Sequence, residues 1–338
     1  MKAPFFALAA SLLAASVAAL GPTVLVSVRA VPPELAGRIR EARGFQQSAF
    51  GQLFVFDRRG HTVYGIDEQQ TSMWEIVQIG AEPGRILDPT AFSVAPDGSF
   101  VVADAPGNRG RIQIFGPAGN RLGGFLLATS TRPRLTFENV VMNGIGSLQY
   151  TGTSILLSQP ESGALITEYD LSGRTSRTFG ELRPTGHEPD ADVHLALNSG
   201  IPLGAPNGDL LFVFQAGVPT FRRYDRTGRL LFERAIQGRE IDRIVEELPR
   251  SWPRSAATGE LPLVRPTIRA ATVDRNGRLW VSFVAPFTYV FDADGDKVRM
   301  VEFRGAGAVT PNSLFFGPRG TLLVTPGLYE FDPRLVGP

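Results

Sequence analysis

The feature that most limits the fold of this chain is a short motif that recurs along the sequence. Each copy is an aromatic residue at the end of an apolar run, followed within a few residues by a turn signal, most often one with glycine. They follow one another at intervals of about 40 to 67 residues, which is typical of repeat architectures. The chain is therefore expected to contain six copies of one small unit. The copies are "YGIDEQQ" near Asp67, "IFGPAGN" at Gly116, "YDLSGR" at Asp170, "YDRTGR" at Asp225, "FDADGD" at Asp292 and "FDPR" at Asp332.

Each copy also contains an earlier turn followed by an apolar run of strand length. These segments are "GQLFVFD", "PDGSFVVAD", "TGTSILLS", "NGDLLFVF", "RNGRLWVS" and "PRGTLLVT". Their Val, Ile, Leu and Phe content favours strands, while Pro, Asp and Gly supply the turn conformations. One unit then reads as four short antiparallel strands joined by tight turns, which is the blade of a β-propeller. We predict an all-β, six-bladed propeller of four-stranded blades that forms a single domain over residues 20–338.

The last copy lacks a fourth strand, because only six residues follow Asp332. An unpaired outer edge would expose a row of backbone donors and acceptors. The β-prone segment "TVLVSVRAV", from Thr23 to Val31, is not used by any copy. We predict that this N-terminal strand pairs with the strand ending near Asp332 and closes the last blade. A free terminal arm is the alternative.

The segment "FSVAPDGSFVVADAPGNRGRIQIFGPAGNRL" resembles an NHL repeat. Asp104, Asn108, Arg111 and Ile112 fall in the Asp…Asn…Arg-Ile pattern of that family. The resemblance implies a six-bladed propeller of the wider gluconolactonase, NHL and TolB-like group. NHL propellers mostly bind proteins, RNA or small molecules. The wider group also includes gluconolactonase-like hydrolases and peptidyl-hydroxyglycine lyases.

The N-terminal segment 1–19 has a short basic start, an apolar run and small residues before Leu20, which together predict a secretory signal peptide. A retained membrane anchor is the alternative, since the apolar run is just long enough to span a bilayer. The chain contains no cysteine, which excludes a disulfide framework and suits a bacterial periplasm or medium. The net charge of +1 offers no bulk attraction to nucleic acid. We expect a secreted or periplasmic monomer that binds neither nucleic acid nor, once the leader is removed, a membrane.

The long connections between the predicted strands fall on one face of the ring, and long irregular segments are often functional. The longest is the insert 237–268, between blades four and five, and its "REIDRIVEEL" predicts a short amphipathic helix. Because arginine binds carboxylates and phosphates, and tryptophan offers an apolar platform, we predict a site for a small anionic ligand or a protein. A solvated, arginine-rich surface is the alternative. The candidate ligand-binding residues are Arg85, Arg132, Arg134, Asn143, Trp252, Arg254 and Arg269.

A second candidate site is the segment "HEPDADVH", which contains two of the three histidines in the chain. Imidazole and carboxylate groups together bind Zn, Mn or Ca. His187, His194 and Asp190 are therefore candidate metal ligands. The segment lacks tight ligand spacing, and a polar loop is the alternative.

Two positions bear on whether the propeller is an enzyme. Gluconolactonase-like propellers hold a divalent metal centrally, with Asn and Asp among its ligands, and Asn143 in "MNGIGSL" resembles the first of these. The position that resembles the second is Arg269, and a guanidinium group offers no lone pair to a metal ion. We therefore expect an NHL-like binding module without a cofactor. A divergent metal-dependent hydrolase or lyase is the alternative.

Overall fold

The computed structural model describes residues 21–130, 133–137, 140–143, 147–252, 254, 262 and 264–334. Regular structure in these residues is almost entirely β-strand, which confirms the predicted all-β class. No helix in this described part of the chain has the length and apolar character needed to cross a membrane. The helices are α1 (Pro33–Ala36), α2 (Ala191–Leu197) and α3 (Arg239–Glu246), with short 3₁₀ turns at Pro106–Asn108 and Pro160–Ser162.

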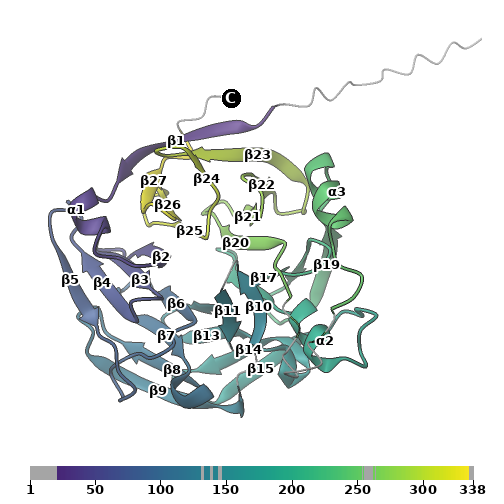
Figure 1. Cartoon of the computed structure of the whole chain (residues 1–338), viewed down its shortest axis with the longest axis horizontal. Helices are drawn as coiled ribbons and strands as arrows, with labels where there is room; N and C mark the ends of the chain where they lie inside the picture. Colours follow the sequence, from purple (N-terminus) through teal and green to yellow (C-terminus); the bar gives the residue numbers. More distant parts are fainter. Residues whose placement is uncertain are drawn as a thin grey trace, which may run out of the picture.

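Four separate antiparallel four-stranded sheets follow one another along the chain. Their strands pair in sequence order, so each sheet is one local unit, as the repeat predicts. Figure 1 shows the sheets arranged around a ring in a propeller-like way. The first two sheets contain β2 (Ala42–Gln47), β3 (Leu53–Asp57), β4 (Thr62–Ile66) and β5 (Met73–Val77), then β6 (Ala91–Val94), β7 (Phe100–Asp104), β8 (Arg109–Phe115) and β9 (Arg121–Ser130). The other two contain β12 (Leu148–Tyr150), β13 (Ser154–Ser158), β14 (Ala164–Asp170) and β15 (Thr175–Glu181), then β16 (Gly200–Gly204), β17 (Leu210–Phe214), β18 (Thr220–Tyr224) and β19 (Leu230–Ala235).

A nine-stranded sheet occupies the rest of the ring, and the N-terminal strand β1 (Thr23–Ala30) lies in its middle. The first half of β1 pairs in parallel with β23, and its second half pairs antiparallel with β27. The predicted pairing with the strand ending near Asp332 is therefore present, and the pairing with β23 is an addition. The sheet order is β20 (Ile268–Val273), β21 (Leu279–Phe283), β22 (Thr288–Phe291), β23 (Lys297–Arg304), β1, β27 (Tyr329–Phe331), β26 (Leu322–Thr325) and β25 (Ser313–Phe316), with β24 (Ala308–Val309) paired to β23.

The core is divided into apolar clusters that lie between neighbouring sheets. One cluster, for example, contains residues from all the strands between β3 and β8 and so lies between the first two sheets. In it, Phe100 stacks on Phe115 with ring centroids 5.1 Å apart. Another joins β16–β19 to β20–β22, and α3 packs on it through the buried Ile241 and the half-buried Ile244 and Val245. The amphipathic helix expected in "REIDRIVEEL" is therefore present. Because each sheet packs mainly on its neighbours, no single large core is needed.

The turn glycines adopt the conformation that the repeat requires. Gly119, between β8 and β9, has φ = 84°, and a Cβ atom there would lie 2.2 Å from the Ile76 carbonyl oxygen. Gly277, between β20 and β21, has φ = 75°, but a Cβ atom there would meet no other atom within 4 Å. A larger residue at either position would be strained by the positive φ, but only at position 119 would its Cβ atom also overlap a backbone atom.

We expect Gly119→Val to lower the free energy of unfolding by at least about 2 kcal/mol, because strain and backbone overlap add together. The matched variant Gly277→Val should lower it by only about 1 kcal/mol, through strain alone. Urea denaturation of both variants measures the difference. Equal losses would show that the contact with the Ile76 carbonyl has no energetic consequence.

Candidate functional site

A cavity of about 320 Å³ lies along the middle of the ring. Its wall is formed by the innermost strands β2, β6, β12, β16, β20 and β25, and each of these strands contacts the next, with β25 against β2. The lining contains no Asp or Glu among the described residues. Its polar residues are Arg43, Gln46, Thr90, Ser93, Ser147, Gln149, Gln215, Arg269, Thr272, Asn312 and Ser313.

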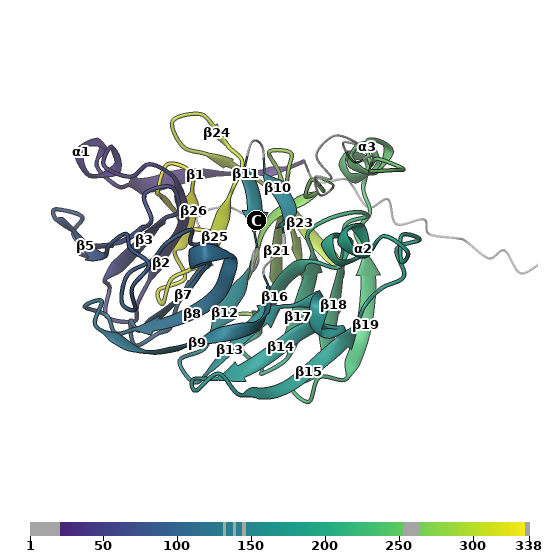
Figure 2. The same cartoon turned by 60° about the horizontal axis from the view of Figure 1, so that its bottom comes forward.

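The lining residues separate into an upper and a lower level. The upper level is the end of the ring where the innermost strands begin, and it contains Arg43, Arg269 and Asn312. The lower level is the end where these strands finish, and it contains Gln46 and Gln149. Figure 2 shows that the helices and the β10–β11 hairpin lie on one side of the ring, the side on which the long connections emerge. Apolar side chains such as Leu203 and Phe316 line the wall between the polar groups.

Arg269 is held at the upper level by its own strand and by the neighbouring sheets. The Gln215 carbonyl accepts hydrogen bonds from the backbone N–H groups of Thr267 (2.7 Å) and Ile268 (3.2 Å), which fixes the start of β20. The Arg269 Nη1 atom donates to the Asn312 Oδ1 atom at 2.6 Å. The Asn312 backbone N–H in turn donates to the Thr325 carbonyl at 2.7 Å. The start of β20 and, through Asn312, strand β26 therefore determine where this guanidinium group lies.

Arg43 belongs to a charged group beside the same level. Glu41 accepts from Arg43 Nε and from Arg58 Nη2, both at 2.7 Å. Burial alone would raise the pKa of Glu41, but the hydrogen bonds from Arg58 and Arg43 outweigh burial and lower it. The carboxylate is ionised at neutral pH, so these three residues carry a net charge of +1. The buried Asp57 orders this segment by accepting from the Glu41 backbone N–H at 2.9 Å.

The lower level is a belt of hydrogen bonds from one innermost strand to the next. The Val94 N–H donates to the Gln46 Oε1 atom at 2.7 Å, and the Tyr150 N–H donates to the Ser93 Oγ atom at 3.0 Å. The Gly204 N–H donates to the Gln149 Oε1 atom. These side chains satisfy backbone donors at strand edges that would otherwise be unpaired. The belt therefore links the sheets and presents the amide side chains to the cavity.

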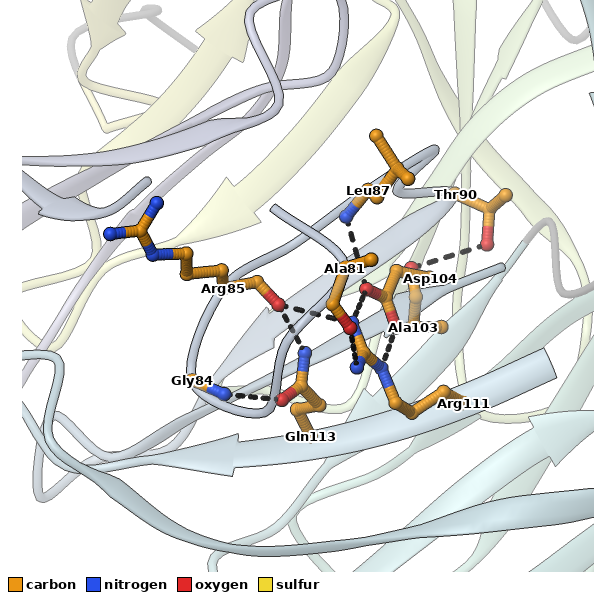
Figure 3. A network of polar contacts seen from close by, with 9 residues as sticks. All are labelled: Ala81, Gly84, Arg85, Leu87, Thr90, Ala103, Asp104, Arg111 and Gln113. Atoms are coloured by element: carbon orange, nitrogen blue, oxygen red, sulfur yellow. Dashed lines mark hydrogen bonds and ion pairs between the residues drawn. The ribbon is translucent and has the colours of Figure 1, made fainter. Parts of the chain in front are cut away.

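The Asp104–Arg111 pair orders the connection that leads into β6, as Figure 3 shows. The Asp104 carboxylate is fully buried and lies 2.5 Å from Arg111 Nη2, with Arg111 Nε at 2.9 Å. Arg111 also donates to the carbonyls of Ala81 (2.6 Å) and Arg85 (3.1 Å), and the Leu87 N–H donates to Asp104 at 3.1 Å. The residues of the Asp…Arg pattern thus fix residues 81–87, just before Thr90 at the cavity.

The predicted metal ligands lie around helix α2 and make other contacts. Asp190 accepts from the Val193 N–H at the start of α2 and forms an ion pair with Arg254 at 2.5 Å. His194 Nδ1 lies 2.7 Å from Thr185 Oγ1, while the His187 ring packs edge-on against Trp252, with centroids 4.9 Å apart. Among the described residues there is no group of three or more His, Asp or Glu side chains that could hold a metal ion.

The pKa of Asp190 reflects this pairing. Burial acts to raise it, but the hydrogen bonds from Arg254 and from the Val193 N–H lower it overall. Arg254 also lies 2.8 Å from Asp192. The polar loop weighed as the alternative describes only the first half of this segment, because residues 187–190 form a turn and a helix begins at Ala191. The sequence contains signals for this helix. They are an N-cap residue, Asp190, and apolar residues at helical spacing, Val193, Ala196 and Leu197, which are buried.

The ligand-binding candidates are distributed over several places. Arg269 lines the cavity, whereas Arg85 is exposed and contributes its backbone carbonyl to the network in Figure 3. Arg254 pairs with Asp190 and Asp192 at the start of α2. Trp252 packs on His187 and on the apolar cluster that includes Val193 of α2. Arg134 lies in β10 (Pro133–Phe137) and Asn143 in β11 (Val140–Asn143), and their side chains, like the whole of Arg132, lie outside the described part of the structure.

The β10–β11 hairpin was not predicted, since it lies in one of the long connections that were expected to be irregular. The hairpin contacts α2, and Leu135 packs with Val193, Leu197 and Val264 in a small apolar cluster. Both views draw it toward the middle of the ring. We call the hairpin together with α2 the cap. The cap lies on the side of the ring where Arg43 and Arg269 line the cavity.

Sequence reasoning missed the neutral amides of the cavity, namely Gln46, Gln149, Gln215 and Asn312. A signal was available for Gln149, which is a polar residue between Leu148 and Tyr150 in a short inner strand, and for Gln46, which follows Phe45 in "GFQQ". Arg43, in the same strand as Gln46, was also missed. These side chains come together only when the ring closes, and no local sequence pattern predicts which inner strands then become neighbours.

The sequence matches no protein-family model and no curated protein. Among solved structures, virginiamycin B lyase from Staphylococcus aureus is similar over 83% of this chain and 76% of its own, with 11% identity and a TM-score of 0.49. A streptogramin B lyase is similar over 85% of this chain and 91% of its own, with 13% identity and a TM-score of 0.48. A protein of unknown function from Bacteroides caccae is similar over 77% of this chain and 81% of its own, with 12% identity and a TM-score of 0.45. The propeller-like arrangement described above rests on this chain's own sheets.

Proposed function

We propose that this chain is an exported, NHL-like binding module whose ring has six blades. The count of six treats the nine-stranded sheet as two blades that share β1. Its support is that β1 leaves β23 after Val26 and joins β27 from Ser27. The NHL-like assignment is supported by the Asp104–Arg111 pair, and export is supported by the N-terminal sequence alone.

The ligand of this module is a small anionic molecule bound in the central cavity. The observation that carries this proposal is the charge of the lining: two arginines contribute to it, and the described lining residues include no carboxylate. Glu41 forms ion pairs with both Arg43 and Arg58, whereas the described residues that line the cavity with Arg269 contribute no carboxylate of their own. A guanidinium group inside a partly enclosed, low-dielectric cavity attracts a carboxylate or phosphate more strongly than one in bulk water does.

Thermal-shift measurements of the purified chain with a panel of small carboxylates and phosphates test this proposal. We expect at least one anion to raise the melting temperature and the shift to shrink at high salt, because charge-assisted contacts are screened. Arg269→Gln should abolish most of the shift. The control Arg174→Gln removes an arginine that is 84% exposed outside the cavity lining, and it should respond like the wild type.

The proposal fails if no anion shifts the melting temperature, or if Arg269→Gln responds like the wild type. A shift produced by zinc, manganese or calcium and lost in His187→Ala or His194→Ala would instead favour the metal-dependent hydrolase or lyase.

A further inference from the structure

The hydrogen-bond acceptors of four side chains in the cavity are already in use. Gln46 Oε1, Ser93 Oγ and Gln149 Oε1 each accept from a backbone N–H of the next inner strand. Asn312 Oδ1 accepts from Arg269. Because backbone N–H and guanidinium N–H groups can only donate, these contacts also determine which end of each amide side chain is the oxygen.

The atoms that remain for a ligand on these side chains are therefore donors. Each amide retains its NH₂ group, the Ser93 hydroxyl retains its proton, and the guanidinium groups of Arg43 and Arg269 have no acceptor atom at all. Some lining side chains do retain an acceptor: the Thr90 hydroxyl donates to the Ala103 carbonyl at 3.4 Å, and Gln215, Ser147 and Thr272 carry donors and acceptors alike. Beside Gln46, Gln149 and Arg269 the lining presents donors, and there it favours a ligand group that accepts, because a donor on the ligand would lose its hydrogen bond with water without replacement.

The donors lie at the two levels defined above. Arg43 and Gln46 are three residues apart on β2, which corresponds to about 10 Å of strand rise. Arg269 shares the upper level with Arg43, and Gln149 shares the lower level with Gln46. One carboxylate bound at the upper level would therefore leave the amide donors of the lower level without a partner on the ligand.

We propose that the ligand of the cavity is a small dianion, of the dicarboxylate class, with one anionic group at each level. This inference rests on the proposed function and goes beyond it, because it specifies two acceptor groups and their separation. The neutral amides serve the second group. The amide NH₂ groups bind the second anionic group by donating hydrogen bonds. Because they are neutral, they need no counter-charge when the cavity is empty, as a second cluster of arginines would.

Isothermal titration calorimetry with probes of equal chain length tests the proposal on the full mature chain. The probes are adipate with two carboxylates, hexanoate with one, aminocaproate with a carboxylate and an ammonium group, and uncharged hexanediol. We expect adipate to bind at least about tenfold more tightly than hexanoate, because charge-assisted hydrogen bonds form at the second end. Aminocaproate should bind more weakly than hexanoate, and hexanediol should give no measurable binding.

The variant Gln149→Glu isolates the lower level. Its carboxylate retains an oxygen for the Gly204 N–H, so the belt is kept, while the NH₂ donor is replaced by an anionic acceptor of the same shape. The order of affinities should reverse, with aminocaproate above adipate. Gln46→Glu is a second variant of the same design, should the first fail to fold.

Two outcomes separate this inference from the proposed function. If adipate and hexanoate bind equally, both depend on Arg269, and Gln149→Glu leaves their ratio unchanged, the two-level inference is wrong and anion binding stands. If no probe binds and Arg269→Gln changes nothing, both are wrong.

Discussion

Replacing Asp104 by alanine is expected to lower the free energy of unfolding by about 3–5 kcal/mol, the usual consequence of leaving one partner of a buried ion pair alone. The Asp104 carboxylate is fully buried and the Arg111 side chain is 11% exposed, so the remaining guanidinium charge would be poorly solvated. The connection over residues 81–87 would also lose the contacts that fix it before β6. Urea denaturation of Asp104→Ala measures the loss.

The control for this variant is an ion pair of the same kind on the surface. Arg174 lies 3.1 Å from Asp170 and is 84% exposed, and Arg174→Ala should change stability by less than about 1 kcal/mol. A loss below about 1 kcal/mol in Asp104→Ala would show that the pair does not organise the connection in the way described.

Removal of the N-terminal strand should have an effect of similar size. A mature chain that begins at Pro32 loses the buried side chains of Leu25 and Val31, which together contribute about 3–6 kcal/mol. It also exposes the outer edges of β23 and β27, and it loses the Arg29 contact with the Glu68 carbonyl at 3.1 Å. We expect a marked fall in melting temperature and a tendency to associate, measured by calorimetry and light scattering.

The point variant Val26→Thr is the matched control for this truncation. Val26 lies in the same strand but is 61% exposed, so its replacement should leave the melting temperature unchanged within error. An unchanged melting temperature in the truncated chain would mean that β1 is a dispensable arm, despite its pairing with both strands.

The sheets could be predicted because their determinants are local. Gly119 and its counterparts mark the turns, and the apolar runs between them have strand length, so the order of strands follows directly from the repeat. The partner of β1 was predictable for a different reason: the last copy lacked a strand, and an open edge needs to be covered. Its parallel pairing with β23 was not predictable, since no pattern in Thr23–Ala30 specifies a second partner.

The site was predictable only in part. Arg269 stood out because it occupies the position that resembles a metal-binding Asp of gluconolactonase-like propellers. Gln46 and Gln149, by contrast, acquire a role only when closure of the ring brings their strands together. Trp252 and Arg254 were grouped with Arg269 because the long connections were expected to emerge on one face of the ring. The structure instead has them contact α2, where Asp190 and Asp192 satisfy Arg254.

The most direct test of the account is a calorimetric titration of adipate into the wild type and into Arg269→Gln, each at low and at high salt. The account predicts one binding site per chain, an affinity that falls as salt is added, and at least about a tenfold loss of affinity in the variant, because a charge-assisted contact is removed. Binding of equal strength in the two proteins, or no heat of binding in the wild type, would contradict the assignment of the central cavity as an anion site.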